Sequence, residues 1–220
     1  MRTGIQNFKR ARSLEAKELR ETTILQAART LAAAHGVRKI SLGDIADDVG
    51  MHKSALLRYF ETREEIFLIL TGEGWREWSA AVRKELTGFA ELSALKVAAT
   101  LAKTLTARPM FCDLLAQAPL NLERNVSIDA IRSFKLVALN EVKLIASELK
   151  RVELSSRQST DTIATATSMA GAFWQMATPA PEVLTLYRNE PQLAHAIVDI
   201  ERRLTQILGA LIAGFLIEKR

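Results

Sequence analysis

The side chains best suited to chemistry in this chain lie in the short stretch 52–58, HKSALLR. Lys53 and Arg58 carry nitrogen donors that can reach guanine edges or phosphate oxygens, and the methyl group of Ala55 can meet the methyl group of a thymine. Each of these side chains taken alone is also compatible with an ordinary solvated surface. Together they predict a polar helix face that meets nucleic acid.

The segment 41–63, SLGDIADDVGMHKSALLRYFETR, contains the elements that would position these side chains. It is typical of two short helices joined by a tight turn, with a third helix following at once. Ala46 is small enough for the first two helices to cross closely, and Gly50 tolerates a positive φ in the turn. The apolar residues that would hold the segment together are Ile45, Val49, Met51, Leu56 and Tyr59. This spacing predicts a helix-turn-helix at 41–60, whose second helix enters the major groove.

The formal charge is divided unevenly along the chain. Residues 1–63 hold 12 lysines and arginines and 7 acidic residues, an excess of +5, whereas residues 64–220 hold 18 of each. The whole excess therefore accompanies the helix-turn-helix, which favours attraction to phosphate over a merely solvated basic face. We expect residues 1–13, with Lys9, Arg10 and Arg12, to form a loose basic arm.

Composition predicts a globular protein without a membrane span. The 220 residues are 48% hydrophobic, and the single cysteine, Cys112, excludes an internal disulfide and suits a reducing compartment. We see no signal peptide, and the longest apolar run, 207–217, is about half of the ~20 residues that a membrane span requires. We therefore expect a cytoplasmic, nucleoid-associated protein that does not bind membranes.

Apolar residues recur at intervals of three and four, and period-2 runs are absent, so we predict an all-α fold. The first helix is expected at 14–35 and ends at Gly36, while Ser41 with Asp44 and Thr62 with Glu65 mark two further helix starts. The remaining helices are expected at 62–86, 91–107, 110–118, 127–152, 156–177 and 191–218. We predict a three-helix N-terminal domain (18–78) and a larger helical domain for ligand binding and dimerisation (79–220).

Residues 18–78 resemble the N-terminal DNA-binding domain of the TetR/AcrR family of bacterial transcriptional regulators. The resemblance rests on the motifs ILQAA (24–28), HGV (35–37), SL (41–42), DIA (44–46), VGM (49–51) and LLRYFETREE (56–65). It implies a homodimeric regulator, in the first instance a repressor that a small molecule releases from a near-palindromic operator in double-stranded DNA. Activation of transcription is the alternative. Leu57 stands where the family often has an aromatic residue, so the base preference there is open.

The resemblance and the helix pattern together predict a DNA-contact set. The resemblance implies that Ser41, Tyr59 and Arg63 contact the DNA backbone. The other residues of the set would lie near bases or on the outer face of the helix. The predicted DNA-binding residues are Ser41, His52, Lys53, Ser54, Ala55, Leu57, Arg58, Tyr59 and Arg63. A metal-ligand role for His52 is disfavoured, because the other histidines are distant in sequence and no cysteine lies near.

The last predicted helix carries a continuous apolar seam with small residues near its end. Together with the small residues of 156–177, the seam predicts an intermolecular four-helix bundle, although part of it must belong to the chain's own core. The predicted interface residues are Ile197, Ile200, Leu204, Ile207, Leu211 and Phe215.

Large aromatic residues between the two ends could line a pocket for a small apolar or amphipathic ligand, or could be plain core. The candidate pocket residues are Phe67, Trp75, Trp78, Phe111, Phe134 and Trp174. We find no nucleophile–base arrangement, phosphate loop or metal-spaced cluster, so we predict no enzyme, no cofactor and no metal. A helical enzyme or carrier with an incidental basic end, or a protein-binding adaptor, is the rival interpretation.

Overall fold

The structure, a computed structural model, describes residues 2–217, with side chains from Glu15 to Ile217. Every regular element in that part of the chain is helical, which confirms the predicted all-α fold. The elements are α1 (Arg2–His35), η1 (Val37–Lys39), α2 (Leu42–Asp48), α3 (Lys53–Leu56), α4 (Arg63–Thr87), α5 (Ala94–Thr106), α6 (Pro109–Gln117), η2 (Ala118–Leu122), α7 (Ile128–Leu149), η3 (Lys150–Val152), α8 (Ser156–Ala177), α9 (Pro181–Asn189), η4 (Pro191–Ala196) and α10 (Ile200–Ile217).

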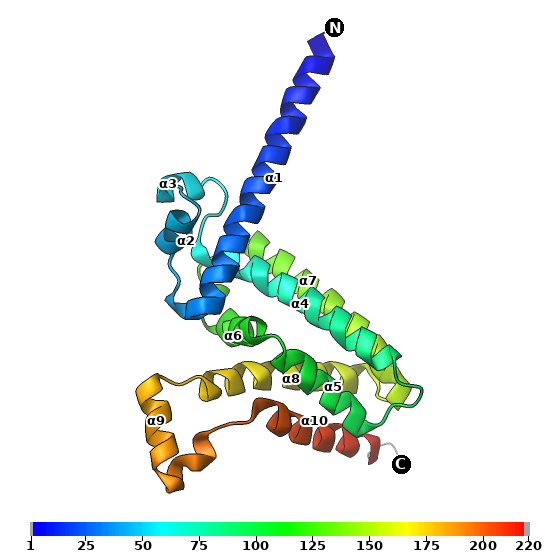
Figure 1. Cartoon of the computed structure of the whole chain (residues 1–220). Helices are drawn as coiled ribbons and strands as arrows, with labels where there is room; N and C mark the ends of the chain where they lie inside the picture. The colour runs from blue at the N-terminus through cyan, green and yellow to red at the C-terminus, as the bar shows by residue number, and fades with distance from the viewer. Residues whose placement is uncertain (1, 218–220) are drawn as a thin grey trace.

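The N-terminal unit consists of the C-terminal half of α1 with α2 and α3 packed beside it (Figure 1). Ile24, Ala28 and Ile45 are fully buried between these helices. The prediction of a loose arm at 1–13 and of a helix start at 14 is wrong for residues 2–13, because α1 begins at Arg2 and extends away from the rest of the molecule. The side chains of residues 1–14, including Lys9, lie outside those that the structure describes.

Local signals fix the boundaries of the two short helices. The Ser41 hydroxyl accepts a hydrogen bond from the Asp44 backbone N–H, and the Asp44 carboxylate accepts one from the Ser41 N–H, so the predicted capping box is present. Gly50 has φ +62°, the left-handed conformation predicted for the turn. The Thr62 hydroxyl accepts from the Glu65 N–H and starts α4.

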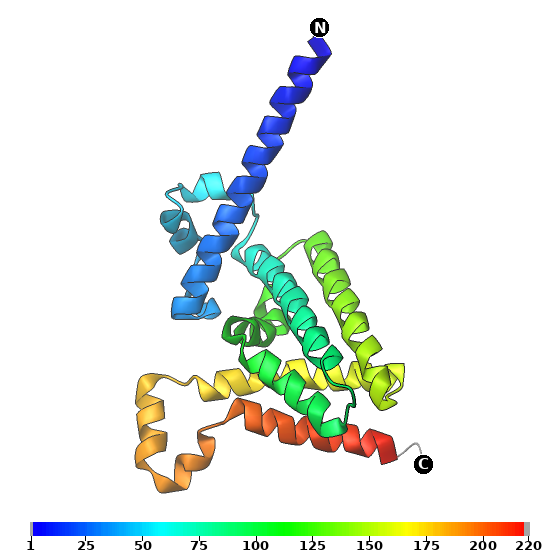
Figure 2. The same cartoon turned by 45° about the vertical axis from the view of Figure 1, so that its right-hand side comes forward.

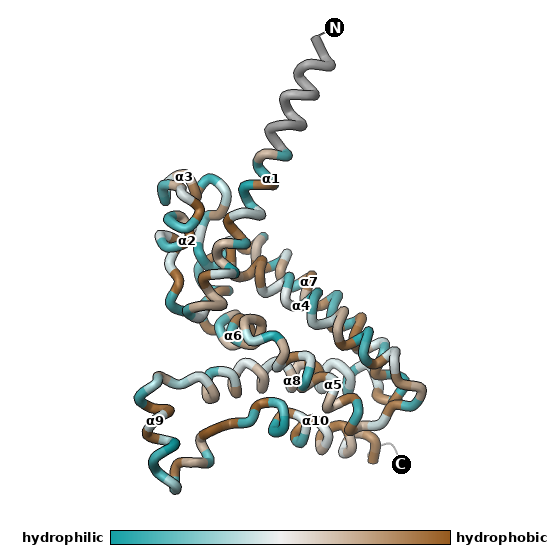
Figure 3. Tube along the Cα trace, viewed as in Figure 1, coloured by the Kyte–Doolittle hydropathy of each residue, from teal (hydrophilic) through white to brown (hydrophobic). Residues whose placement is uncertain are grey.

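Helix α4 runs from the N-terminal unit into the body of the molecule, side by side with α7 (Figures 1 and 2). Along its length apolar and polar residues alternate every few positions, as Figure 3 shows. Its buried residues include Ile66, Leu70, Trp78 and Val82. One continuous helix therefore belongs to both units.

Helices α5, α8 and α10 lie together below α4, and α6 lies between them and the N-terminal unit (Figure 1). The crossing of α6 and α8 is close because Gly171 has no side chain: a Cβ added there would lie 2.8 Å from the Ala116 backbone nitrogen. At Gly74 of α4 the ring of Phe111 occupies the space that a side chain would need. Two glycines thus set how closely α6 approaches its neighbours.

The predicted helix 191–218 is wrong at its start, and α9 was not predicted. Pro191 begins a 3₁₀ turn that ends at Ala196, and the chain is extended at Ile197 before α10 starts at Ile200. The Asp199 carboxylate accepts a hydrogen bond from the Arg202 N–H and marks this second start. The apolar periodicity continued across the break and concealed it.

Candidate nucleic-acid interface and ligand sites

The short helix α3 and the turn that follows it at 57–59 present one mainly polar face to solvent, which we call the α3 face. His52, Lys53, Ser54, Leu57 and Arg58 are exposed, with Leu57 44% exposed. Ala55 and Tyr59 are half-buried at the edge of this face, whereas Leu56 is fully buried behind it. The structure therefore brings the predicted contact residues 52–55 and 57–59 together, although α3 itself ends at Leu56 and Leu57, Arg58 and Tyr59 lie in the turn after it.

His52 has a local partner that the sequence did not indicate. It is the N-cap of α3, and its Nδ1 accepts a hydrogen bond from the Ser54 N–H and lies 2.8 Å from the Ser54 hydroxyl. This contact starts the helix and fixes where the ring points. In the part of the chain with described side chains, no group of three or more His, Cys, Asp or Glu residues could hold a metal ion.

Arg63, at the start of α4, holds the chain segment that precedes α2. Its Nε donates to the carbonyl of Ile40 and its Nη2 to the carbonyl of Val37, while Nη1 lies 3.1 Å from the Glu64 carboxylate. The guanidinium also lies 4.8 Å from the centre of the Phe67 ring. With three N–H groups engaged, Arg63 fixes α4 against the entrance of the helix-turn-helix.

Ser41 is exposed at the start of α2, on the same unit as α3. Its backbone N–H and its hydroxyl each donate to the Asp44 carboxylate at 2.7 Å. These hydrogen bonds, the backbone one first, lower the pKa of Asp44 below its usual value because they stabilise the ionised form. The exposed cap thus carries a fixed negative charge on the same unit as the α3 face.

Two side chains tie the N-terminal unit to the helices behind it. Arg29 of α1 forms ion pairs with Glu73 and, at 3.6 Å, Glu77 of α4. Asp113 of α6 accepts a hydrogen bond from the Val37 N–H at 2.8 Å. This role of Asp113 was not predicted, because its partner lies 76 residues away and no local pattern marks it.

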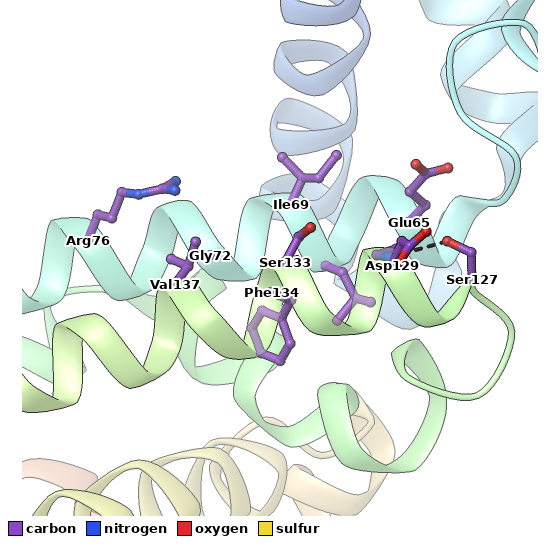
Figure 4. Close-up of a pocket in the computed structure, with 11 residues that line it drawn as sticks. Glu65, Ile69, Gly72, Arg76, Ser127, Asp129, Ser133, Phe134 and Val137 are labelled. Atoms are coloured by element: carbon purple, nitrogen blue, oxygen red, sulfur yellow. Dashed lines mark hydrogen bonds between the residues drawn. The ribbon is translucent and has the colours of Figure 1, made fainter.

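A groove of about 400 Å³ lies between α4 and α7. Figure 4 shows its residues along the two helices, with Arg76 at one end and Glu65 and Asp129 near the other. Its middle is apolar and includes Ile69 and Phe134. The groove is therefore apolar in its middle and charged at both ends.

The six aromatic residues predicted as a pocket do not surround one cavity. Phe67 and Trp78 are fully buried, and Trp78 donates from Nε1 to the Thr104 hydroxyl at 3.0 Å. The ring of Trp75 lies 5.5 Å from that of Trp78 and 5.8 Å from that of Phe111, in edge-on packing typical of a core. The remaining aromatic residues line different spaces: Phe134 the α4–α7 groove, Trp174 a cleft beside the end of α1, and Phe111 a third cavity.

The predicted seam of α10 divides between two environments. Leu204 is fully buried inside its own chain, together with Leu208 and Ile212. The remaining predicted seam residues are half-buried or exposed: Ile197, Ile200, Ile207, Leu211 and Phe215. Small side chains are prominent on the exposed faces of the two helices, namely Ala210, Ala213 and Gly214 on α10 and Ala164, Ser168 and Ala172 on α8.

Several solved structures have a fold similar to that of this chain. FadR of Bacillus halodurans, a fatty acid degradation regulator, is 15% identical to this chain and superposes with a TM-score of 0.58. The match covers 88% of this chain and 95% of that FadR chain. Thermus thermophilus FadR, solved with lauroyl-CoA, is 17% identical with a TM-score of 0.58, covering 87% and 93%. RolR, solved with resorcinol, is 15% identical with a TM-score of 0.57, covering 92% and 90%.

No curated protein sequence is significantly similar to this chain. Among the described helices none combines the length and the apolar character needed to cross a membrane. Residues 24–70 match the family model for bacterial regulatory proteins of the tetR family. Residues 73–219, more than half of the chain, match the model for the tetracyclin repressor-like C-terminal domain. The chain therefore belongs to the TetR family of transcriptional regulators.

Proposed function

We propose that this regulator is a repressor that binds a near-palindromic operator as a homodimer and leaves it when a small molecule binds. The single observation that carries the proposal is the exposed polar face of α3, held out from a core that Leu56 anchors. An α-helix fits the major groove, where base edges present distinct donors and acceptors. No catalytic step is part of this function.

Within the interface, each contact follows from the exposure and chemistry of its side chain. Lys53 and Arg58 donate to base edges or phosphates, and the apolar Ala55 and Leu57 meet thymine methyl groups. The backbone contacts proposed for Ser41, Tyr59 and Arg63 set the register of the helix. Because Arg63 already bonds two carbonyls, its first role is to position α2 and α3, and only the N–H groups that are not engaged in this way are left for a phosphate.

The proposed dimer forms through the exposed faces of α8 and α10. Small residues on these faces permit close approach of two helix pairs around a two-fold axis. They include Ala164, Ser168 and Ala172 on α8 and Ala210 and Ala213 on α10. Two operator half-sites bind far more tightly when they are linked, so a small DNA-binding unit gains affinity from pairing.

The α4–α7 groove is the proposed ligand site. A molecule bound there contacts α4, which continues without a break from the end of the helix-turn-helix to the body of the molecule. A shift of α4 changes the separation of the two recognition helices, and the spacing of operator half-sites is fixed. The ligand acts only through its different affinity for the two separations. The apolar middle and charged ends of the groove favour an amphipathic ligand.

Selection of genomic DNA fragments by the purified chain tests the proposal. We expect one or a few fragments to be enriched, and Lys53→Ala or Arg58→Ala to weaken binding to them by about 1–3 kcal/mol for each base-edge hydrogen-bonding pair removed. Lys150→Ala, which removes an exposed lysine from η3, is the matched control and should leave the affinity unchanged. A helical enzyme or carrier would enrich no fragment above background.

The dimer is tested separately, by sedimentation. Ala213→Glu places a carboxylate on the exposed face of α10 and should produce monomers, whereas Ala90→Glu, in the exposed α4–α5 connection, should not. If the two chains of Ala213→Glu still associate with unchanged affinity for each other, this face of α10 does not belong to the interface.

A further inference from the structure

A cleft lies where the N-terminal unit meets α6 and α8. It has a volume of about 580 Å³ and is lined by the end of α1 with η1, the start of α6 and the end of α8. It is separate from the α4–α7 groove, with which it shares no lining residue. Its binding chemistry can therefore be considered independently of the proposed function.

A buried carboxylate lines this cleft. Asp113 is only 8% exposed, and it accepts one hydrogen bond from the Val37 N–H at 2.8 Å and one from the Gln175 side-chain amide at 2.9 Å. A carboxylate has about four acceptor positions, so capacity remains on both oxygens. Within residues 15–217, no lysine, arginine or histidine forms an ion pair with it.

The walls around Asp113 are largely apolar. Ala32 and Ala33 of α1 line one side, Met110 of α6 another, and the half-buried indole of Trp174 a third. An indole face attracts cations as well as hydrocarbon. A buried carboxylate beside an aromatic ring and an apolar wall is complementary to a positively charged group carried on a hydrocarbon body.

His35, Arg38 and Lys39 also line the cleft, but all three are exposed. The charges of Arg38 and Lys39 lie in solvent, where they are screened, whereas Asp113 is screened much less. An anion attracted by Arg38 and Lys39 would be repelled by the buried carboxylate of Asp113. A multiply charged cation would be repelled by Arg38 and Lys39 at the mouth of the cleft. The arrangement favours a ligand with a single positive charge.

We propose that this cleft binds a small lipophilic amine. Its ammonium group donates to the free acceptor positions of Asp113, and its hydrocarbon body lies against Trp174 and Met110. Because the cleft joins residues of the N-terminal unit to α6 and α8, such a ligand contacts both units at once. If the bound amine alters the relative position of the two units, it changes the affinity for DNA by some factor. DNA then changes the affinity for the amine by the same factor.

Calorimetric titration of the full chain tests the site with two matched probes, 2-phenylethylamine and 3-phenylpropionate. For molecules of this size we expect a Kd on the order of 1 mM for the amine and at least about tenfold weaker binding of the carboxylate. Equal or tighter binding of the carboxylate, or no binding of the amine, would overturn the proposal.

Two variants locate the binding. Asp113→Asn should weaken the amine at least about tenfold, since it removes the charge-assisted hydrogen bond. Ala33→Phe fills the cleft from an exposed position of α1 and should also abolish binding, while Ala34→Phe, exposed but outside the cleft, should not. If Asp113→Asn does not fold, the Ala33 and Ala34 pair decides. Unchanged binding by Ala33→Phe would contradict the site and leave Asp113 with a structural role alone.

Discussion

Replacing Gly171 by alanine would test the close crossing of α6 and α8. A Cβ at this position would lie 2.8 Å from the backbone nitrogen of Ala116, 3.1 Å from its Cα and 3.2 Å from the carbonyl carbon of Leu115. These are backbone atoms within a helix, so no side-chain rotation can relieve the overlap. The two helices have to separate.

The expected loss of stability follows from a comparison of Gly171→Ala with Gly209→Ala on α10. There an added Cβ would make ordinary contacts, 3.9 Å from the Cβ of Ala98 and 4.0 Å from Cδ1 of Leu95. Both substitutions gain about 1 kcal/mol from the better helix propensity of alanine. Because that gain cancels between the two variants, Gly171→Ala should be less stable than Gly209→Ala by the overpacking cost alone, about 1–3 kcal/mol.

Urea unfolding followed by circular dichroism measures this difference. Both variants have to be compared at one protein concentration, because association contributes to the stability of an oligomer. Gly209→Ala should be at least as stable as the unchanged chain, and Gly171→Ala less stable than Gly209→Ala. If Gly171→Ala were stabilised as much as Gly209→Ala, α6 and α8 could not cross so closely.

Three other predictions concern single side chains. Asp44→Asn should destabilise the fold at neutral pH, because the lowered pKa of Asp44 stabilises the folded state at pH values above the ordinary pKa of 3.8. The difference in stability from the unchanged chain should disappear as the pH falls through the lower pKa that Asp44 has in the folded state. Urea midpoints measured across the acid range would show this. Burial raises the pKa of Cys112 to about 12, so a thiol reagent at neutral pH should modify the folded protein slowly and the urea-unfolded protein fast. Rapid modification of the folded protein would contradict the burial of Cys112. Arg63→Lys should cost roughly 1.5–3 kcal/mol for each charged hydrogen bond removed, measured by unfolding, because an ammonium group cannot span the carbonyls of Ile40 and Val37 together.

The helix-turn-helix was predictable because its signals are local. Ser41 and Asp44 cap α2 within four residues, Gly50 supplies the positive φ that the turn needs, and Leu56 falls on the inner face by helical spacing alone. None of these features depends on where the rest of the chain lies. The exposed side of α3 follows directly, since whatever does not face inward on so short a helix faces solvent.

The cavities were not predictable, because they depend on how helices cross. Phe111 packs against Gly74 and meets the ring of Trp75 edge-on, and Trp75 packs in the same way on Trp78, so these rings contact one another instead of surrounding one pocket. Asp113 acquires its partners from η1 and α8, which are distant in sequence. A pattern of residue types along a helix shows which side is apolar but not whether a neighbour fills the space beside it.

The last helix shows how one apolar pattern can serve two purposes. Leu204, Leu208 and Ile212, four residues apart, are buried by the chain's own helices, since α10 packs against α5 and α8. A helix that served only this core would be polar on its other sides. The opposite side of α10 instead carries small residues, including Ala210 and Ala213, in exposed positions. Exposed small residues on this side favour close contact with a second helix, and the proposed dimer supplies one for the side that the chain itself leaves open.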